Sequence, residues 1–186
     1  MSHGACRVVV FVCLALLLVS ATGFCANDQL TVVQDESSME RTIEAYLKGE
    51  HDLVVQEVML EEDDLALSLP YDGDPMPDFR VTVDSQPLNR DEDTGKVIER
   101  GLVVNLFTGV MVPESKFEDA IRVINELNRR KVFASVYIDT DGEIVLSWTL
   151  NVLEQGLATE YVYDAIVRLV QNWDALWKEL EPVLGH

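Results

Sequence analysis

The chain has 186 residues, of which 48% are hydrophobic, so it is long enough to bury one sizeable core. Its 33 acidic residues outnumber the 14 basic ones and give a formal net charge of −19. A surface this acidic repels phosphate backbones, which argues against nucleic acid as a partner.

The first 26 residues have the pattern of a secretory signal peptide. Arg7 precedes the apolar run "VVVFVCLALLLV" at residues 8–19, and the small residues of "SATG" follow it. Cleavage after Ala21 or Gly23 fits the small-residue preference of such sites. The alternative is an uncleaved anchor, because the run and its flanks carry no charge for nearly the length of a membrane span.

All three cysteines, Cys6, Cys13 and Cys25, lie within this N-terminal segment. A lipoprotein anchor at Cys25 is disfavoured, because "TGFC" lacks the apolar and small residues that precede a lipidated cysteine. The rest of the chain therefore has no thiol for a disulfide or a zinc site. Residues 27–36 read as a polar segment, and we expect residues 37–186 to form one domain held together by its core.

The first half of this domain predicts one helix and several strands. A helix is expected in "SSMERTIEAYLKGE", where Ser37 and Glu40 make a capping box and Gly49 supplies the stop. "DLVVQEVML" and "LALSLP" alternate around the acidic turn "EEDD", which predicts a hairpin. "FRVTVD" predicts a further strand, and the apolar run "GLVVNLFTGVMV" predicts a well-buried central strand.

The second half predicts a helix, a hairpin and a long final helix. Ser115 and Glu118 make a capping box at the start of "ESKFEDAIRVINELNRRK", whose basic last turn complements the helix dipole. "VFASVYID" and "EIVLSWTL" are expected as strands on either side of "DTDG". Thr159 is expected to cap a helix with two adjacent apolar lines, which are too wide for a coiled-coil seam.

This order of elements predicts an α+β domain. We expect an antiparallel sheet of about five to six strands, with an N-terminal helix, a mid-chain helix and a long C-terminal helix.

The chain also resembles the YbjN-domain family of bacterial proteins, described as sensory transduction regulators. The resemblance rests on "GLVVNLFTGVMVP", "AIRVINELNRR", "FASVYIDTDGEIVLSWTL" and "GLATE", with "NELN" at residues 125–128 as the most family-like tetrapeptide. It covers roughly residues 37–184. It implies a fold like that of type III secretion chaperones and no established reaction, cofactor or catalytic residue. With the N-terminal segment, it leads us to expect an exported protein of the bacterial periplasm or cell envelope, with membrane contact only through that segment if it stays uncleaved.

Neither acidic loop has the pattern of a calcium site. With Gly142 of "DTDG" at the sixth loop position, Tyr137 and Trp148 would occupy the first and last ligand positions, where calcium needs oxygen ligands. In "NRDEDTGKVIER", Thr94 replaces the turn glycine and Arg100 the final glutamate. We therefore interpret "DTDG" as a hairpin turn, since glycine accepts a positive φ.

Catalytic patterns are also missing from the sequence. Beyond the N-terminal segment the only histidines are His51 and His186, so a Ser–His–Asp arrangement would depend on His51. The acids of residues 61–64 stand in a turn and are explained by solvation. No glycine-rich phosphate loop or metal-spaced histidine cluster occurs. We predict no catalytic residue, no cofactor and no metal, and a protein that is not an enzyme.

The remaining hypothesis is a non-enzymatic interaction module, chaperone-like or regulatory. It would bind an unidentified protein partner, or a second copy of itself, through a sheet face or the long helix. Tyr163, Trp173 and Trp177 are its candidate contact residues, and packing in the core is the alternative for each. The second hypothesis is an envelope protein that binds a small ligand or lipid on the sheet face beneath the C-terminal helix.

Overall fold

The computed structural model describes residues 29–61, 64–130 and 134–185, so the predictions for residues 1–26 lie outside it. Within these ranges, no helix is both long enough and apolar enough to cross a membrane. The elements in chain order are β1 (Gln29–Leu30), α2 (Glu36–His51), β2 (Gln56–Glu61), β3 (Asp64–Tyr71), β4 (Phe79–Arg90), β5 (Val97–Met111), the 3-10 turn η1 (Glu114–Lys116), α3 (Phe117–Arg130), β6 (Ser135–Ile138), β7 (Glu143–Val152), β8 (Leu157–Ala158) and α4 (Glu160–Leu184).

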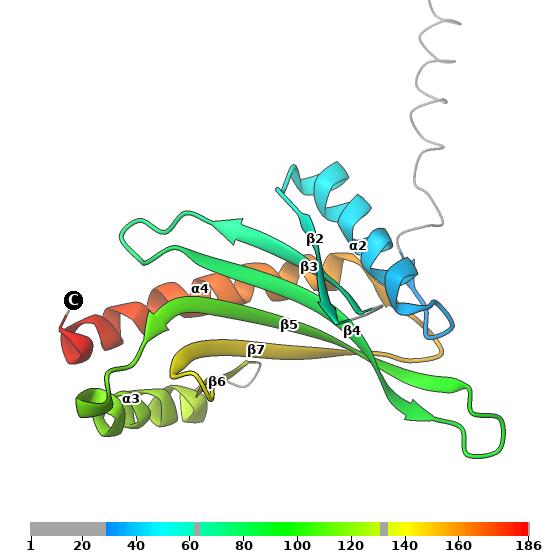
Figure 1. Cartoon of the computed structure of the whole chain (residues 1–186). Coiled ribbons are helices and arrows are strands. Elements are labelled where there is room, and N and C mark those ends of the chain that lie inside the picture. The colour runs from blue at the N-terminus through cyan, green and yellow to red at the C-terminus, as the bar shows by residue number, and fades with distance from the viewer. Residues whose placement is uncertain (1–28, 62–63, 131–133, 186) are drawn as a thin grey trace, which may run out of the picture.

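The main sheet has six strands in the order β2-β3-β4-β5-β7-β6, and every neighbouring pair is antiparallel. The predicted α+β class with its three helices is therefore confirmed. β4 and β5 are long enough to project beyond the sheet as a two-stranded arm (Figure 1). A second, two-stranded sheet joins β1 to β8 and was not predicted, because two-residue strands carry no periodic signal.

The core lies between one side of the sheet and the helices. Alternate residues of a strand point to opposite faces, and in β5 the buried set is Leu102, Val104 and Leu106. These residues join one hydrophobic cluster with the buried side chains of α2, α3 and α4. α4 runs along the length of the sheet and contributes the largest buried side chain, Trp173 (Figure 1).

The first helix begins and ends differently from the prediction. Asp35 is its N-cap and accepts a hydrogen bond of 2.7 Å from the Ser38 amide, so the predicted Ser37–Glu40 capping box is wrong. Glu40 is instead fully buried on the side of the helix that faces the sheet. The helix also passes Gly49 and ends at Asp52, which adopts the left-handed conformation with φ 53°.

The start of the second helix is also different. The 3-10 turn η1 precedes α3, and its N-cap Pro113 makes no side-chain capping bond. The predicted capping box of Ser115 and Glu118 does not form, because α3 begins at Phe117 and both residues are already in helical backbone.

The "DTDG" stretch is the predicted turn of a hairpin, between β6 and β7. Its Asp139 carboxylate accepts hydrogen bonds of 2.9 Å from the amides of Asp141 and Glu143. Gly142 has φ 90°, which a side chain would strain. The carboxylate therefore stabilises its own turn.

The "NELN" tetrapeptide closes one edge of the sheet. Asn128 of α3 donates from Nδ2 to the Val136 carbonyl at 2.8 Å and accepts from the Val136 amide at 2.9 Å. Val136 belongs to β6, the last strand of the sheet on this side. The side-chain amide thus occupies the place that a further strand would take, which satisfies backbone groups that an edge strand leaves unpaired.

We expect Asn128→Ala to lower the free energy of unfolding by about 1–2 kcal/mol, because two part-buried backbone groups lose their partner. Urea denaturation followed by circular dichroism measures the change. Asn125→Ala is the matched control, since Asn125 is exposed on the same helix and the substitution has the same effect on helix propensity. Equal stability of the two variants would contradict this role for Asn128.

Candidate functional site

The side of the sheet away from the helices is the candidate functional surface, which we call the open face. None of its residues belongs to the hydrophobic core cluster. Strand register aligns its side chains in three rows: Pro70, Arg80, Phe107, Val145 and Tyr137; Gln56, Ser68, Thr82, Asn105, Ser147 and Ser135; and Asp84, Val103 and Thr149.

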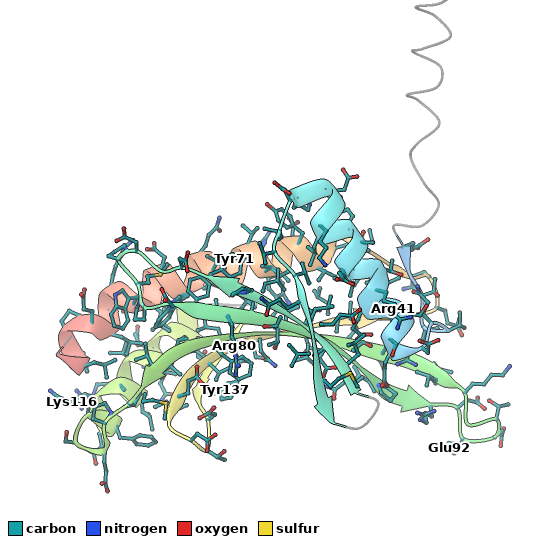
Figure 2. The ribbon with its side chains drawn as sticks, turned by 45° about the horizontal axis from the view of Figure 1, so that its top comes forward. Arg41, Tyr71, Arg80, Glu92, Lys116 and Tyr137 are labelled. Carbon is teal, nitrogen blue, oxygen red and sulfur yellow. The ribbon has the colours of Figure 1, made fainter. Side chains whose placement is uncertain are left out.

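The first row joins a cation to aromatic rings. The Arg80 guanidinium carbon lies 4.8 Å from the centroid of the Phe107 ring, within the range of a cation–π interaction. Val145 is completely buried although it lies on the open face, because its neighbours in register on either side are Phe107 and Tyr137. Figure 2 shows Arg80 and Tyr137 on the sheet and Arg41 on α2, and the register places Phe107 and Val145 between Arg80 and Tyr137.

Tyr137 is a hydrogen-bond donor at physiological pH. Partial burial, together with the nearby charge of Asp139, raises the pKa of its phenol above the usual 10.0. The ring is nevertheless 42% exposed. It can therefore offer both an apolar surface and an O–H group to a partner.

The second row is polar and uncharged across all six strands. It consists of two amides, Gln56 and Asn105, and four hydroxyl side chains, and it runs from β2 to β6. The Oδ1 atom of Asn105, in the middle, is buried and accepts no hydrogen bond from any described residue.

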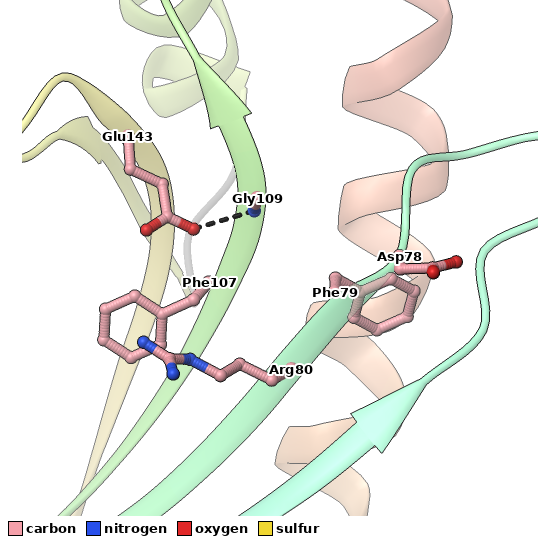
Figure 3. A pocket seen from close by; sticks show the side chains of 6 residues that line it. All are labelled: Asp78, Phe79, Arg80, Phe107, Gly109 and Glu143. Atoms are coloured by element: carbon pink, nitrogen blue, oxygen red, sulfur yellow. Dashed lines mark hydrogen bonds between the residues drawn. The ribbon is translucent and has the colours of Figure 1, made fainter.

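A shallow depression of about 340 Å³ lies beside Arg80 and Phe107 of the first row. Its lining comes from Asp78, Phe79, Arg80, Phe107, Gly109 and Glu143 (Figure 3). Glu143 accepts a hydrogen bond of 2.7 Å from the Gly109 amide, so its carboxylate is already engaged at the margin of the depression. The Asp78 carboxylate accepts a hydrogen bond of 3.0 Å from the Gly73 amide, whereas Arg80 makes no ion pair with any described residue and is the available cation there.

Gly109 shapes this end of the depression. It has φ 68° where the register between β5 and β7 shifts, and a Cβ atom there would lie 3.0 Å from the Asp78 carbonyl oxygen. The neighbouring Thr108 is buried and donates to the Ile144 carbonyl at 2.8 Å, which holds the irregular strand in place. The bulge turns the Gly109 amide toward Glu143.

The open face is poor in charge although the chain is strongly acidic. Its three rows contain one cation, Arg80, and one anion, Asp84, and the carboxylate of Glu143 beside the first row is bonded to the Gly109 amide, whereas the whole chain has a formal net charge of −19. Depletion of charge together with aromatic side chains and an arginine is typical of the centre of protein–protein interfaces. Repeated small polar residues supply additional hydrogen-bonding groups.

The two tryptophans predicted as contact residues lie in the core. Trp173 is 0% exposed and Trp177 is 5% exposed, and their ring centroids are 5.5 Å apart. The Trp173 indole Nε1 has no hydrogen-bond acceptor among the described residues. Neither ring presents a surface to a partner in this conformation, so a partner-binding role for them stays a prediction.

Tyr163, the third predicted residue, is half-buried against His51. Their rings are stacked with centroids 3.4 Å apart and an interplanar angle of 7°. The His51 Nε2 atom also lies 3.3 Å from the Tyr46 hydroxyl. His51 therefore joins the end of α2 to α4.

Glu40 is a buried carboxylic acid outside the open face. One of its oxygens accepts a hydrogen bond of 2.9 Å from the Ser85 amide, and the other has no partner among the described residues. The pairing of β3 with β4 ends at Val83, so the Ser85 amide lies beyond the reach of β3. Burial raises the pKa of Glu40 to about 7, against the opposing effect of the hydrogen bonds from Ser85.

The open-face residues were not singled out in the sequence, and only part of the signal was available there. Arg80 stands at an outward position of the alternating stretch "FRVTVD", which periodicity does reveal. Phe107 lies in a continuous apolar run, where periodicity cannot assign a face. The place of Tyr137 on the open face could not be predicted without knowing that β6 pairs with β7.

Comparison with known proteins gives one result. Residues 98–181 match the YbjN family model, which is described as "putative bacterial sensory transduction regulator". The match begins in β5 and ends in α4, so α2 and the first strands lie outside it. None of the curated proteins matches the chain.

The buried acid leads to a pH-dependent prediction. The pKa of Glu40 is about 7 in the folded state and near 4.5 when solvated, so the folded state holds the proton more tightly. Stability should therefore fall as the pH rises from about 4.5 to 7 and then level off. We expect Glu40→Gln to be more stable than the natural protein by about 2–3 kcal/mol above pH 7.5, and equally stable near pH 4.

Urea titrations across this pH range measure the difference. Glu50→Gln, on the exposed side of the same helix, controls for the loss of one negative charge. A constant stability difference between Glu40→Gln and the natural protein at all pH values would show that Glu40 does not carry this proton.

Proposed function

We propose, from the match of residues 98–181 to the YbjN family, that the protein is a regulatory, non-enzymatic module that binds a protein partner on its open face. The observation that carries the proposal is the charge-poor aromatic row of Arg80, Phe107 and Tyr137 in an acidic chain. The family description names regulation and no reaction, which supports a binding role.

The geometry of the open face suits a broad, flat partner surface. The six strands present side chains in register over the whole width of the sheet, and the depression lined by Arg80 is shallow. Arg80 and Tyr137 stand as exposed anchors on either side of Phe107 and Val145. Arginine and tyrosine combine a large contact area with directed hydrogen bonds, which makes them frequent binding hot spots.

A ligand site beneath the C-terminal helix has less support. Between α4 and the sheet, the space is filled by buried side chains, including Leu102 and Leu106 on β5 and Leu169 and Trp173 on α4. The depression lined by Arg80 lies at the end of the open face and is not covered by this helix. We therefore favour the protein-binding hypothesis.

We place this module in the bacterial envelope. The support is the signal-peptide pattern of residues 1–26, whose apolar run follows a single basic residue. The high negative net charge favours solubility of the unbound protein. The long buried core removes the need for disulfides outside that segment.

Quantitative affinity capture from the envelope fraction tests the proposal. We expect Arg80→Glu and Tyr137→Ser each to reduce recovery of a specific partner by about ten-fold or more, because each removes an exposed anchor of the first row. Recovery is measured by mass spectrometry and followed by titration of the purified partner.

Two variants serve as matched controls. Arg41→Glu makes the same charge change on α2, and Tyr161→Ser makes the same ring deletion on α4, both at exposed positions. Both should retain full recovery. If the controls lose the partner as strongly as the open-face variants, the surface is misassigned, and a lipid or metabolite recovered in place of a protein would overturn the function itself.

A further inference from the structure

The two edge strands of the six-stranded sheet, β6 and β2, differ in how far their outer backbone groups are hydrogen-bonded. At β6, the Asn128 side chain bonds both backbone groups of Val136, and α3 packs alongside. At β2, the opposite edge, the only strand partner among the described residues is β3, and no described side chain bonds to the outer backbone. One edge is closed and the other is available for pairing.

β2 also exposes apolar side chains on both of its faces. Val58, opposite Ala66, is 39% exposed, and Met59, opposite Leu65, is 58% exposed. Edge strands in natural proteins are normally protected by lysine, proline or a covering element, because bare edges recruit other strands. The strand "QEVMLE" contains neither lysine nor proline.

The sequence of the β2–β3 hairpin and its flanking segments is strongly acidic. Residues 49–79 contain ten acidic side chains and no lysine or arginine. Glu57 lies on β2 itself, and Glu50 and Asp52 precede it at exposed positions. Pairing β2 with β2 of a second copy would bring these acids together, which like-charge repulsion disfavours, whereas a cationic strand would be attracted.

We propose that β2 is a docking edge for an extended segment of a protein partner that carries lysine or arginine at alternate positions. Such a segment would add to the sheet as a strand beside β2, with main-chain hydrogen bonds providing affinity. Its basic side chains would meet Glu57, and its apolar side chains, on the opposite face, would cover Val58. This inference shares with the proposed function only the premise that the partner is a protein. The docking edge is β2, whereas the proposed function uses the open face.

A fluorescein-labelled peptide of alternating lysine and valine, about eight residues long, is the probe, and fluorescence anisotropy measures its binding to the full chain. We expect saturable binding that weakens with salt. The same peptide with N-methylated alternate amides, which cannot donate to the edge, should bind more weakly by about ten-fold or more. A glutamate–valine peptide should not bind.

Amide hydrogen exchange locates the bound peptide. Exchange should slow at residues 56–59 and stay unchanged at residues 135–138.

Val58→Lys and Met59→Lys each place a repelling charge on β2, and each should weaken the peptide about ten-fold. Tyr161→Lys is the matched control, an exposed apolar residue on α4, and should bind normally. Tyr137→Ser, which tests the open face, should also bind normally, so failure of one proposal is distinguishable from failure of the other.

Three results would overturn this inference. Equal affinity of the N-methylated peptide would show that strand addition is not the mode of binding. Protection that maps to β6 or the open face would place the peptide elsewhere. A dimer of the protein alone that Val58→Lys dissociates would make a second copy the occupant of the edge.

Discussion

The pairing of β5 with β4 on one side and β7 on the other is the interaction on which the rest of the structure depends. β5 has 15 residues, the most of any described strand, and it holds register with both neighbours over most of its length. Because a strand turns successive side chains to opposite faces, this register decides at once that Val104 faces the helices and that Asn105 faces outward. Core and open face are therefore two results of one register.

Local patterns predicted the elements well and the contacts between them poorly. Alternation located β2–β3 and β6–β7, and glycine chemistry identified the "DTDG" turn. The first predicted capping box failed because Glu40 bonds the Ser85 amide instead, and the second failed because a 3-10 turn precedes α3. The role of Asn128 depends on where α3 lies relative to β6, which no local pattern encodes.

The open face and the β2 edge together include residues from the part of the chain that matches the family and from the part before it. Phe107 and Tyr137 lie within residues 98–181, whereas Arg80 and β2 lie before them. The matched part builds the centre of the sheet, the closed edge and the long helix. The preceding part contributes the exposed cation of the open face and the acidic hairpin. A partner that contacts both would distinguish this chain from a protein that shares only the matched part.

The Asn128 side chain has a consequence for assembly. Growth of a sheet from one molecule to the next requires each molecule to offer two unpaired edges, one at each end. Here the amide at β6 removes one of them. Strand pairing through the other can join two chains at most, and then it stops. The protein can thus keep one edge bare without the risk of forming a fibre.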